Sequence, residues 1–187
     1  MAIYISLVVE ERQAGTAERG EGMKAVLISI QPRWCELIAS GKKTVEVRKT
    51  APKLEPPFKC YIYCTKDKKG WFHFGKKARL DGNIICEFVC DGIDEFTPTE
   101  KGVAFKRFKA LHDTCLSVAA IRAYLGSKVG YGWHISNLVI YDSPKALSEF
   151  RSWNGSVCWE GGYPLPTHEI KRAPQSWCYV EELKDAK

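Results

Sequence analysis

Charged and hydroxyl side chains gather in residues 42–48, which read KKTVEVR. If this run is a β-strand, its side chains alternate, so Thr44, Glu46 and Arg48 share one face and the two valines face the core. A Lys43/Glu46 pair offers general acid–base chemistry. A carboxylate accepts hydrogen bonds, and a guanidinium donates as a fork to a carbonyl or an anion. The run therefore predicts a polar ligand site.

A second interpretation of the same run needs no ligand. The polar face would then be solvated, and a Glu46/Arg48 pair on it would be worth only a few tenths of a kcal/mol. Gly41 favours the first interpretation, because a glycine allows the tight turn that brings Lys43 to the same cleft. The sequence alone leaves both interpretations open.

The elements next to this run are clear in the sequence. Residues 24–30 (KAVLISI) form a buried-strand pattern, and Pro32 then begins a short helix in which apolar residues recur at i, i+3 and i+4. Gly41 ends that helix as a left-handed cap. The pattern predicts a strand–helix–strand unit that positions residues 42–48.

The rest of the chain indicates a small α+β fold. Ser117 and Gly126 bracket a helix of about two turns, whereas residues 91–112 have poor periodicity and predict a long loop. Further strands are expected at 44–48, 58–64, 83–90, 132–142 and 175–182. About six mostly antiparallel strands with two or three short helices predict a sheet curled into a small barrel.

Charge divides the chain into two parts. Residues 1–22 carry a net charge of −2 and end in a Gly-rich stretch, which leaves +8 on residues 23–187 out of a total of +6. We expect residues 1–22 to be a flexible extension and residues 23–187 to form the domain. A basic domain favours polyanionic partners, nucleic acid first.

No apolar run reaches the length of a membrane span, and no secretory signal is evident, so we expect a cytoplasmic protein without membrane partners.

Eight cysteines raise the question of a metal site. The pairs Cys60/Cys64 and Cys86/Cys90 lie in predicted strands, where four residues span about 13 Å, too far for both sulfurs to bind one zinc ion. The spacing of Cys158, His168 and Cys178 matches no standard zinc pattern. We expect reduced thiols that fill the core, no metal site and no cofactor.

Aromatic and basic residues give modest support for a nucleic-acid partner. RNA-binding proteins combine basic grooves with stacking rings. Trp34 and Trp133 are candidates for such rings, although a core position explains Trp133 better. His134 and Ser136 share one face of the strand at 132–142, where a histidine is more often structural than catalytic. The lysines that we assign to a nucleic-acid groove are Lys42, Lys49, Lys76 and Lys77.

Residues 29–49, SIQPRWCELIASGKKTVEVRK, resemble the signature of ASCH domains in the PUA-like superfamily of small RNA-associated β-barrels. The resemblance extends over residues 23–183 and implies a cleft beside the first helix that holds a nucleobase or nucleotide. Some bacterial members remove the acyl group from N4-acetylcytidine with a Lys and a Thr of this motif. The Lys corresponds to Lys43 and the motif Arg to Arg48, but Glu46 occupies the Thr position.

The expected function is therefore binding of RNA, a nucleobase or a nucleotide. The alternatives are a hydrolase of modified nucleosides or RNA, with Lys43 and Glu46 as catalytic residues, and a protein-interaction module. The oligomeric state stays open. The ligand-binding residues that we predict beside the catalytic candidates are Ser29, Gln31, Trp34, Thr44, Arg48, Trp133, His134 and Ser136.

Overall fold

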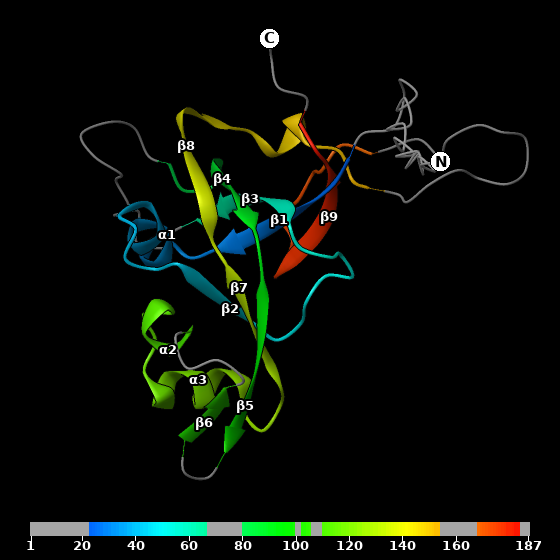
Figure 1. The fold of residues 1–187 in the computed structure, drawn as a ribbon. Helices are drawn as coiled ribbons and strands as arrows, with labels where there is room; N and C mark the ends of the chain where they lie inside the picture. Colours follow the sequence, from blue (N-terminus) through cyan, green and yellow to red (C-terminus); the bar gives the residue numbers. More distant parts are fainter. Residues whose placement is uncertain (1–22, 67–79, 100–101, 106–109, 154–167, 184–187) are drawn as a thin grey trace, which may run out of the picture.

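The computed structural model describes residues 23–66, 80–99, 102–105, 110–153 and 168–183. Within these ranges it shows two β-sheets and three short α-helices (Figure 1). The strands are β1 (Lys24–Ile30), β2 (Val45–Arg48), β3 (Phe58–Cys64), β4 (Ile84–Cys90), β5 (Ile93–Thr99), β6 (Gly102–Phe105), β7 (Gly130–His134), β8 (Ser136–Lys145) and β9 (Trp177–Glu181). The helices are α1 (Pro32–Ala39), α2 (Ala110–Asp113) and α3 (Val118–Leu125), with a 3-10 turn at Leu147–Glu149.

The two sheets are linked by two stretches of chain, each of which continues from a strand of one sheet into a strand of the other. The five-stranded sheet has the order β8-β4-β3-β1-β9, and the four-stranded sheet has the order β2-β7-β5-β6. Only residues 91–92 separate β4 from β5, and only Ile135 separates β7 from β8. The β4–β5 stretch and the β7–β8 stretch therefore pair with each other in both sheets, and the sheets curve around one core. The β1/β3 pair is parallel and the other pairs are antiparallel. The predicted mostly antiparallel α+β fold is confirmed.

The main core lies between the inner face of the five-stranded sheet, α1 and β7. Trp133 of β7 is fully buried there against Ile28, Ile62 and Ile38. The cysteines of β3 and β4 also lie in this core, which confirms that they act as small buried apolar residues. Because one core joins residues from both sheets, it fixes β2 and β7 relative to β1.

Helix α1 follows the sequence pattern closely. Pro32 stands in its first turn, Cys35 and Ile38 face the core, and Gly41 adopts a φ of 72° directly after the helix. This left-handed conformation favours glycine because it lacks a Cβ. The chain then passes through Lys43 and Thr44 and enters β2 at Val45.

The predicted long loop at residues 91–112 is wrong, because this segment contains β5, β6 and α2. Its strand β5 pairs with β7 and buries Phe96 completely, while Glu95 and Thr97 are exposed. A single buried aromatic gives almost no periodic signal. Pairing with a distant strand decides the conformation, as is common for short strands. These additional strands also explain why the structure has more strands than the six expected.

Helix α3 covers the outer face of the four-stranded sheet. The Ser117 hydroxyl accepts a hydrogen bond from the Ala120 amide at 3.1 Å, and Gly126 ends the helix with a φ of 63°, so the predicted caps are confirmed. Ile121 and Leu125 pack against Val47 of β2. Figure 1 shows α2, α3, β5 and β6 together at one end of the molecule. Helix α3 thus stands beside the strand that carries Glu46 and Arg48.

Among the residues that the structure describes, no helix has the length and apolar character needed to cross a membrane.

Candidate functional site

Lys43 is almost completely buried, with 2% of its surface exposed. Its Nζ donates to the main-chain oxygens of Val45 and Thr114, each at 2.7 Å, and lies 3.2 Å from Glu46 Oε2. A lysine ammonium carries three protons, and each of them finds an acceptor here. The tight turn after α1 directs the side chain inward, and the segment before α3 supplies the Thr114 acceptor.

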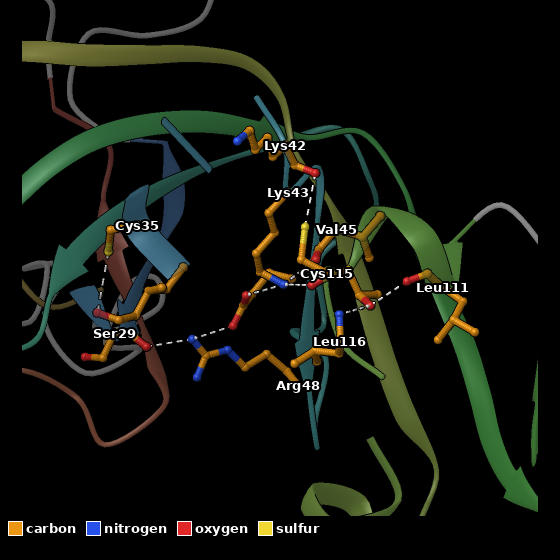
Figure 2. A network of polar contacts seen from close by, with 12 residues as sticks. Ser29, Cys35, Lys42, Lys43, Val45, Arg48, Leu111, Cys115 and Leu116 are labelled. Carbon is orange, nitrogen blue, oxygen red and sulfur yellow. Dashed lines mark hydrogen bonds and ion pairs between the residues drawn. The ribbon is translucent and has the colours of Figure 1, made fainter. Parts of the chain in front are cut away.

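Arg48 approaches the same carboxylate from the other side. Its Nη2 lies 3.1 Å from Glu46 Oε1 and donates to the main-chain oxygen of Ser29 at 2.6 Å. In Figure 2, dashed lines lead from the side-chain nitrogens of Lys43 and Arg48 to the carboxylate oxygens that lie between them. Each oxygen of Glu46 therefore faces one cation, and the group of three carries one net positive charge.

The solvated-face interpretation fails because Glu46 and Arg48 are only 7% and 8% exposed. Both partners lie in a region of low dielectric, where an ion pair stays intact only if every charge has a partner. Alternation along β2 is nevertheless confirmed, since Val47 packs toward α3 while the two charged residues face α1. The charged face of β2 is an interior surface.

The Arg48 guanidinium has a buried donor, its Nε, that finds no hydrogen-bond partner in the part of the chain that the structure describes. A buried N–H without a partner costs about 1–3 kcal/mol. Arg48 also lines the cavity described next.

A cavity of about 450 Å³ lies over the three charged residues. Its size is within the range of small-molecule sites. Helix α1 forms one wall and α3 forms the other, with β2 as the floor. The lining residues are Ser29, Ile30, Gln31, Arg33, Trp34, Lys43, Glu46, Val47, Arg48, Thr65, Leu116, Ala120, Tyr124 and Gln175.

Aromatic rings with cations against them stand on both sides of this cavity. On α1, the Arg33 guanidinium lies 4.3 Å from the centre of the Trp34 ring. On α3, Tyr124 lines the cavity, and Lys49 Nζ lies 4.8 Å from its ring centre. Arg33 and Lys49 are exposed, in contrast to the buried Lys43. The walls thus add apolar surface and further positive charge.

The structure brings together six of the residues that the sequence predicts. They come from β1, the start of α1, the turn after it and β2, so the local strand–helix–strand unit supplies them all. Ser29 faces the cavity, although its hydroxyl donates to the main-chain oxygen of Pro174 at 2.6 Å. The predicted residues that line the cavity are Ser29, Gln31, Trp34, Lys43, Glu46 and Arg48.

Thr44 lies outside the cavity, in contrast to the predicted face shared with Glu46 and Arg48. Strand β2 begins only at Val45. The Thr44 amide donates to the Asp113 oxygen, and its own oxygen accepts from the Ile135 amide. These bonds leave the Thr44 side chain exposed in a separate hollow next to α2.

Three further predicted residues also lie away from the cavity. Trp133 pairs with Glu46 across the β2/β7 ladder but is fully buried in the core. His134 contacts Asp94 at 2.9 Å between Nε2 and Oδ2, and the Ser136 hydroxyl donates to the Val89 oxygen at 2.9 Å. Their positions follow from strand pairing of β7 and β8, which the sequence did not reveal.

The lysines assigned to a nucleic-acid groove do not all lie at the cavity. Lys49 stands beside the cavity through its contact with Tyr124, whereas Lys42 is exposed in the separate hollow near α2. Lys76 and Lys77 lie outside the described residues.

Sequence reasoning missed the wall on α3. Ala120 and Tyr124 are spaced by four residues, which places them on one side of α3 and was a usable signal, and Leu116 lies just before the helix. Thr65 and Gln175 reach the cavity from the ends of distant strands, and no local pattern marks them.

The described residues contain no cluster of three or more His, Cys, Asp or Glu side chains able to hold a metal ion. The polar floor of the cavity instead combines an ammonium, a carboxylate and a guanidinium, which recognise hydrogen-bonding ligands directly.

Comparisons with known proteins agree on the fold. A crystal structure of ASCH from Zymomonas mobilis matches with a TM-score of 0.55 and 18% sequence identity, covering 84% of this chain and 88% of that chain. A variant of that protein with one tyrosine changed to phenylalanine matches with a TM-score of 0.56, 17% identity and coverages of 84% and 91%. A serine-to-alanine variant matches with a TM-score of 0.52, 17% identity and coverages of 84% and 89%.

None of the curated proteins matches the sequence. The family model of the ASCH domain, however, matches residues 28–160, which include the cavity floor and both of its helical walls. With most of the chain matched and the same fold found in solved ASCH structures, this protein belongs to the ASCH domain family.

Proposed function

We propose that this ASCH domain binds a nucleobase or nucleotide, free or within an RNA segment, in the cavity between α1 and α3. The observation that carries the proposal is the buried Lys43–Glu46–Arg48 group at the floor of a cavity of about 450 Å³. Such a floor offers both donors and acceptors to the edge of a base. Trp34 and Tyr124 add the aromatic surface on which bases stack.

Binding of RNA fits the same cavity if one nucleotide leaves the strand and enters it. The basic charge of residues 23–187 supports contacts to the flanking phosphates. Lys49 and Arg33, which are exposed beside the cavity, are suited to such contacts. We place the protein in the cytoplasm, where its free buried thiols stay reduced.

A hydrolase of modified nucleosides is the second candidate. The adjacent ammonium and carboxylate inside the cavity favour it, because this pair could exchange protons with a bound amide. Two features weigh against it. Glu46 replaces the hydroxyl residue of the acylcytidine amidohydrolases that the motif resembles, and Lys43 would have to leave one of its three acceptors unpaired to act as a base.

A protein-interaction module is the third candidate. Protein interfaces are usually broad and place few charges at their centre. A buried charged group at the floor of a cavity serves a small ligand better than a flat partner surface, so this candidate explains fewer of the observed features.

A combined binding and turnover screen tests the proposal. Wild-type protein is titrated with the four nucleosides, their 5′-monophosphates, N4-acetylcytidine and short single-stranded RNAs, and each mixture is then analysed for products. We expect binding of at least one nucleoside, nucleotide or RNA without conversion. The exposed Glu36→Gln on α1 is the matched control for Glu46→Gln, which should lose binding.

Release of acetate from N4-acetylcytidine, or cleavage of RNA, would replace the binding proposal with the hydrolase. Absence of any binding across the panel would contradict both and favour the protein-interaction module.

A further inference from the structure

We propose that a base enters this cavity edge first, with its phosphate outside, and that Glu46 and Arg48 read an N–H donor and a neighbouring acceptor on that edge. The inference rests on the proposed function and adds the orientation and the chemical feature that is recognised. It follows from how hydrogen-bonding capacity and charge are distributed between the floor and the mouth.

The Glu46 carboxylate at the floor can accept further hydrogen bonds. Each oxygen of the Glu46 carboxylate faces one cation, Lys43 or Arg48. A carboxylate has about four acceptor positions on its two oxygens, so positions remain after those two contacts. Because the side chain is only 9% exposed, a ligand that covers it excludes water and must supply a donor in return. An N–H group of a base does so.

The floor also has unused capacity to donate. Arg48 Nη2 serves Glu46 and the Ser29 oxygen, but the Arg48 Nε has no partner among the described residues. A guanidinium has five N–H donors in a fixed plane, and this one is held next to the carboxylate. A ring nitrogen or carbonyl oxygen beside the N–H of the ligand fits this donor.

Charge distinguishes the two ends of the cavity. The floor group carries one net positive charge, but Lys43 and Arg48 already contact Glu46 and main-chain oxygens, so a phosphate placed against Glu46 would meet a like charge. The mouth has Arg33 and Lys49, both exposed and both resting on aromatic rings. A nucleotide that points its base inward therefore places its phosphate near these two cations.

An acceptor next to an N–H donor occurs on the Watson–Crick edge of all four RNA bases, and the test below uses uracil, cytosine and adenine. Single-stranded RNA is read mostly through such edges. Methyl groups on the donor nitrogen remove the donor, whereas a methyl group on C5 of a pyrimidine leaves the edge intact. The inference therefore predicts sensitivity to methylation at one position of the base and tolerance at another.

The first test uses only the wild-type protein, so no variant has to fold. Calorimetric titration compares uridine with 3-methyluridine, cytidine with N4,N4-dimethylcytidine, and adenosine with N6,N6-dimethyladenosine; 5-methyluridine and 5-methylcytidine are the controls. For each nucleoside that binds, we expect about a tenfold or greater loss of affinity on N-methylation. The C5-methyl analogues should bind within about threefold of their parents, because their donor and acceptor are unchanged.

The second test asks whether removal of the Glu46 charge weakens or strengthens binding. If the base lies on the floor, Glu46→Gln weakens the binding of nucleosides and of 5′-monophosphates alike. If the phosphate lies on the floor, the same change strengthens monophosphate binding, because a repelling charge is removed. Thermal unfolding of each sample shows whether the variant is folded. If Glu46→Gln does not fold, the methylation series alone decides.

The third test probes the mouth. Lys49→Gln should weaken 5′-monophosphates several-fold and leave nucleosides unchanged, whereas Lys42→Gln, which changes an equally exposed lysine in the separate hollow, should affect neither. Equal affinity of methylated and unmethylated nucleosides would overturn this inference while the proposed function stands. No binding of any nucleoside, nucleotide or RNA would overturn the proposed function itself.

Discussion

Arg48 Nη2 donates to the main-chain oxygen of Ser29 at 2.6 Å, which joins β2 in the four-stranded sheet to β1 in the five-stranded sheet. The same nitrogen holds Glu46 at 3.1 Å. One guanidinium therefore connects the two sheets and positions the carboxylate at the cavity floor. In this domain, the residues of the candidate site are also part of what holds the fold together, and the predictions below depend on that double role.

Replacing Glu46 with alanine should lower the free energy of unfolding by about 3 kcal/mol or more. The change leaves the buried Lys43 and Arg48 without their common counter-charge, and such losses cost about 3–5 kcal/mol. Chemical denaturation measures the effect. The exposed Glu36→Ala on α1 is the control and should stay within about 0.5 kcal/mol of wild type.

A carboxylate kept only for function would give a small effect of Glu46→Ala on stability. Burial reverses that expectation, because the carboxylate neutralises two interior cations. A wild-type-like stability of the Glu46→Ala protein would show that water reaches the group in solution.

Thr44→Ala and Trp34→Ala should differ clearly in ligand binding. Trp34 lines the cavity, and loss of a ring on which a base stacks costs about 1–3 kcal/mol of binding. Thr44 is exposed in another hollow, so its replacement should leave the affinity unchanged. Titration of the best-bound nucleoside from the screen compares the two variants. A loss of affinity in Thr44→Ala equal to that in Trp34→Ala would move the site to the hollow beside α2.

Thiol alkylation at pH 8 should modify Cys115 before the core cysteines. Burial raises the pKa of the Cys86 and Cys90 thiols from the ordinary value of 9.0 to about 12, and that of Cys178 to about 11. These groups are therefore neutral and unreactive at pH 8, whereas Cys115 is partly exposed. Peptide mass mapping after a short iodoacetamide pulse measures the order, and early labelling of Cys86 or Cys90 would contradict it.

The same raised pKa values predict how stability depends on alkaline pH. Below pH 9, the thiols are protonated in both the folded and the unfolded chain. Between pH 9 and 12, the thiols ionise in the unfolded chain before they ionise in the folded chain. Ionisation therefore stabilises the unfolded state, and the free energy of unfolding falls. Denaturation curves at pH 8 and pH 10.5 test the direction. Because tyrosines and lysines also titrate there, the Cys86→Ala protein is the comparison and should lose less stability over this interval.

RNA binding, where the screen detects it, should weaken strongly as salt rises, because the basic domain contacts phosphates. Exchanging Lys76 and Lys77 for glutamate should weaken it further. This expectation rests on charge alone, since both lysines lie outside the described residues. Affinity for a short RNA is measured at 50 and 200 mM salt. An unchanged affinity would favour a small-molecule ligand over RNA.

Removal of residues 1–22 should change the melting temperature by only a few degrees. These residues differ from the rest of the chain in charge and composition, and a Gly-rich stretch separates them from β1. Calorimetry of the full chain and of residues 23–187 makes the comparison. A large drop would mean that the apolar run at residues 3–9 packs on the domain.

Local sequence determined the unit that carries most of the candidate site. The strand pattern of β1, Pro32 and Gly41 around α1, and the alternation in residues 45–48 are all short-range signals that match the structure, whereas Thr44 lies outside the strand. Glycine and proline fix backbone angles whatever the surroundings, and side chains in a strand must alternate. The position of Lys43 next to Glu46 and Arg48 therefore followed from the sequence.

Tertiary structure decided what those residues do. The Thr114 oxygen that accepts from Lys43 lies 71 residues away along the chain, and the wall with Tyr124 comes from α3. Whether the charged face of β2 meets water or the interior depends on these distant partners. Burial is set by what packs against a residue, so neither the cavity nor the unpaired Arg48 Nε could be read from the residues of β2 alone.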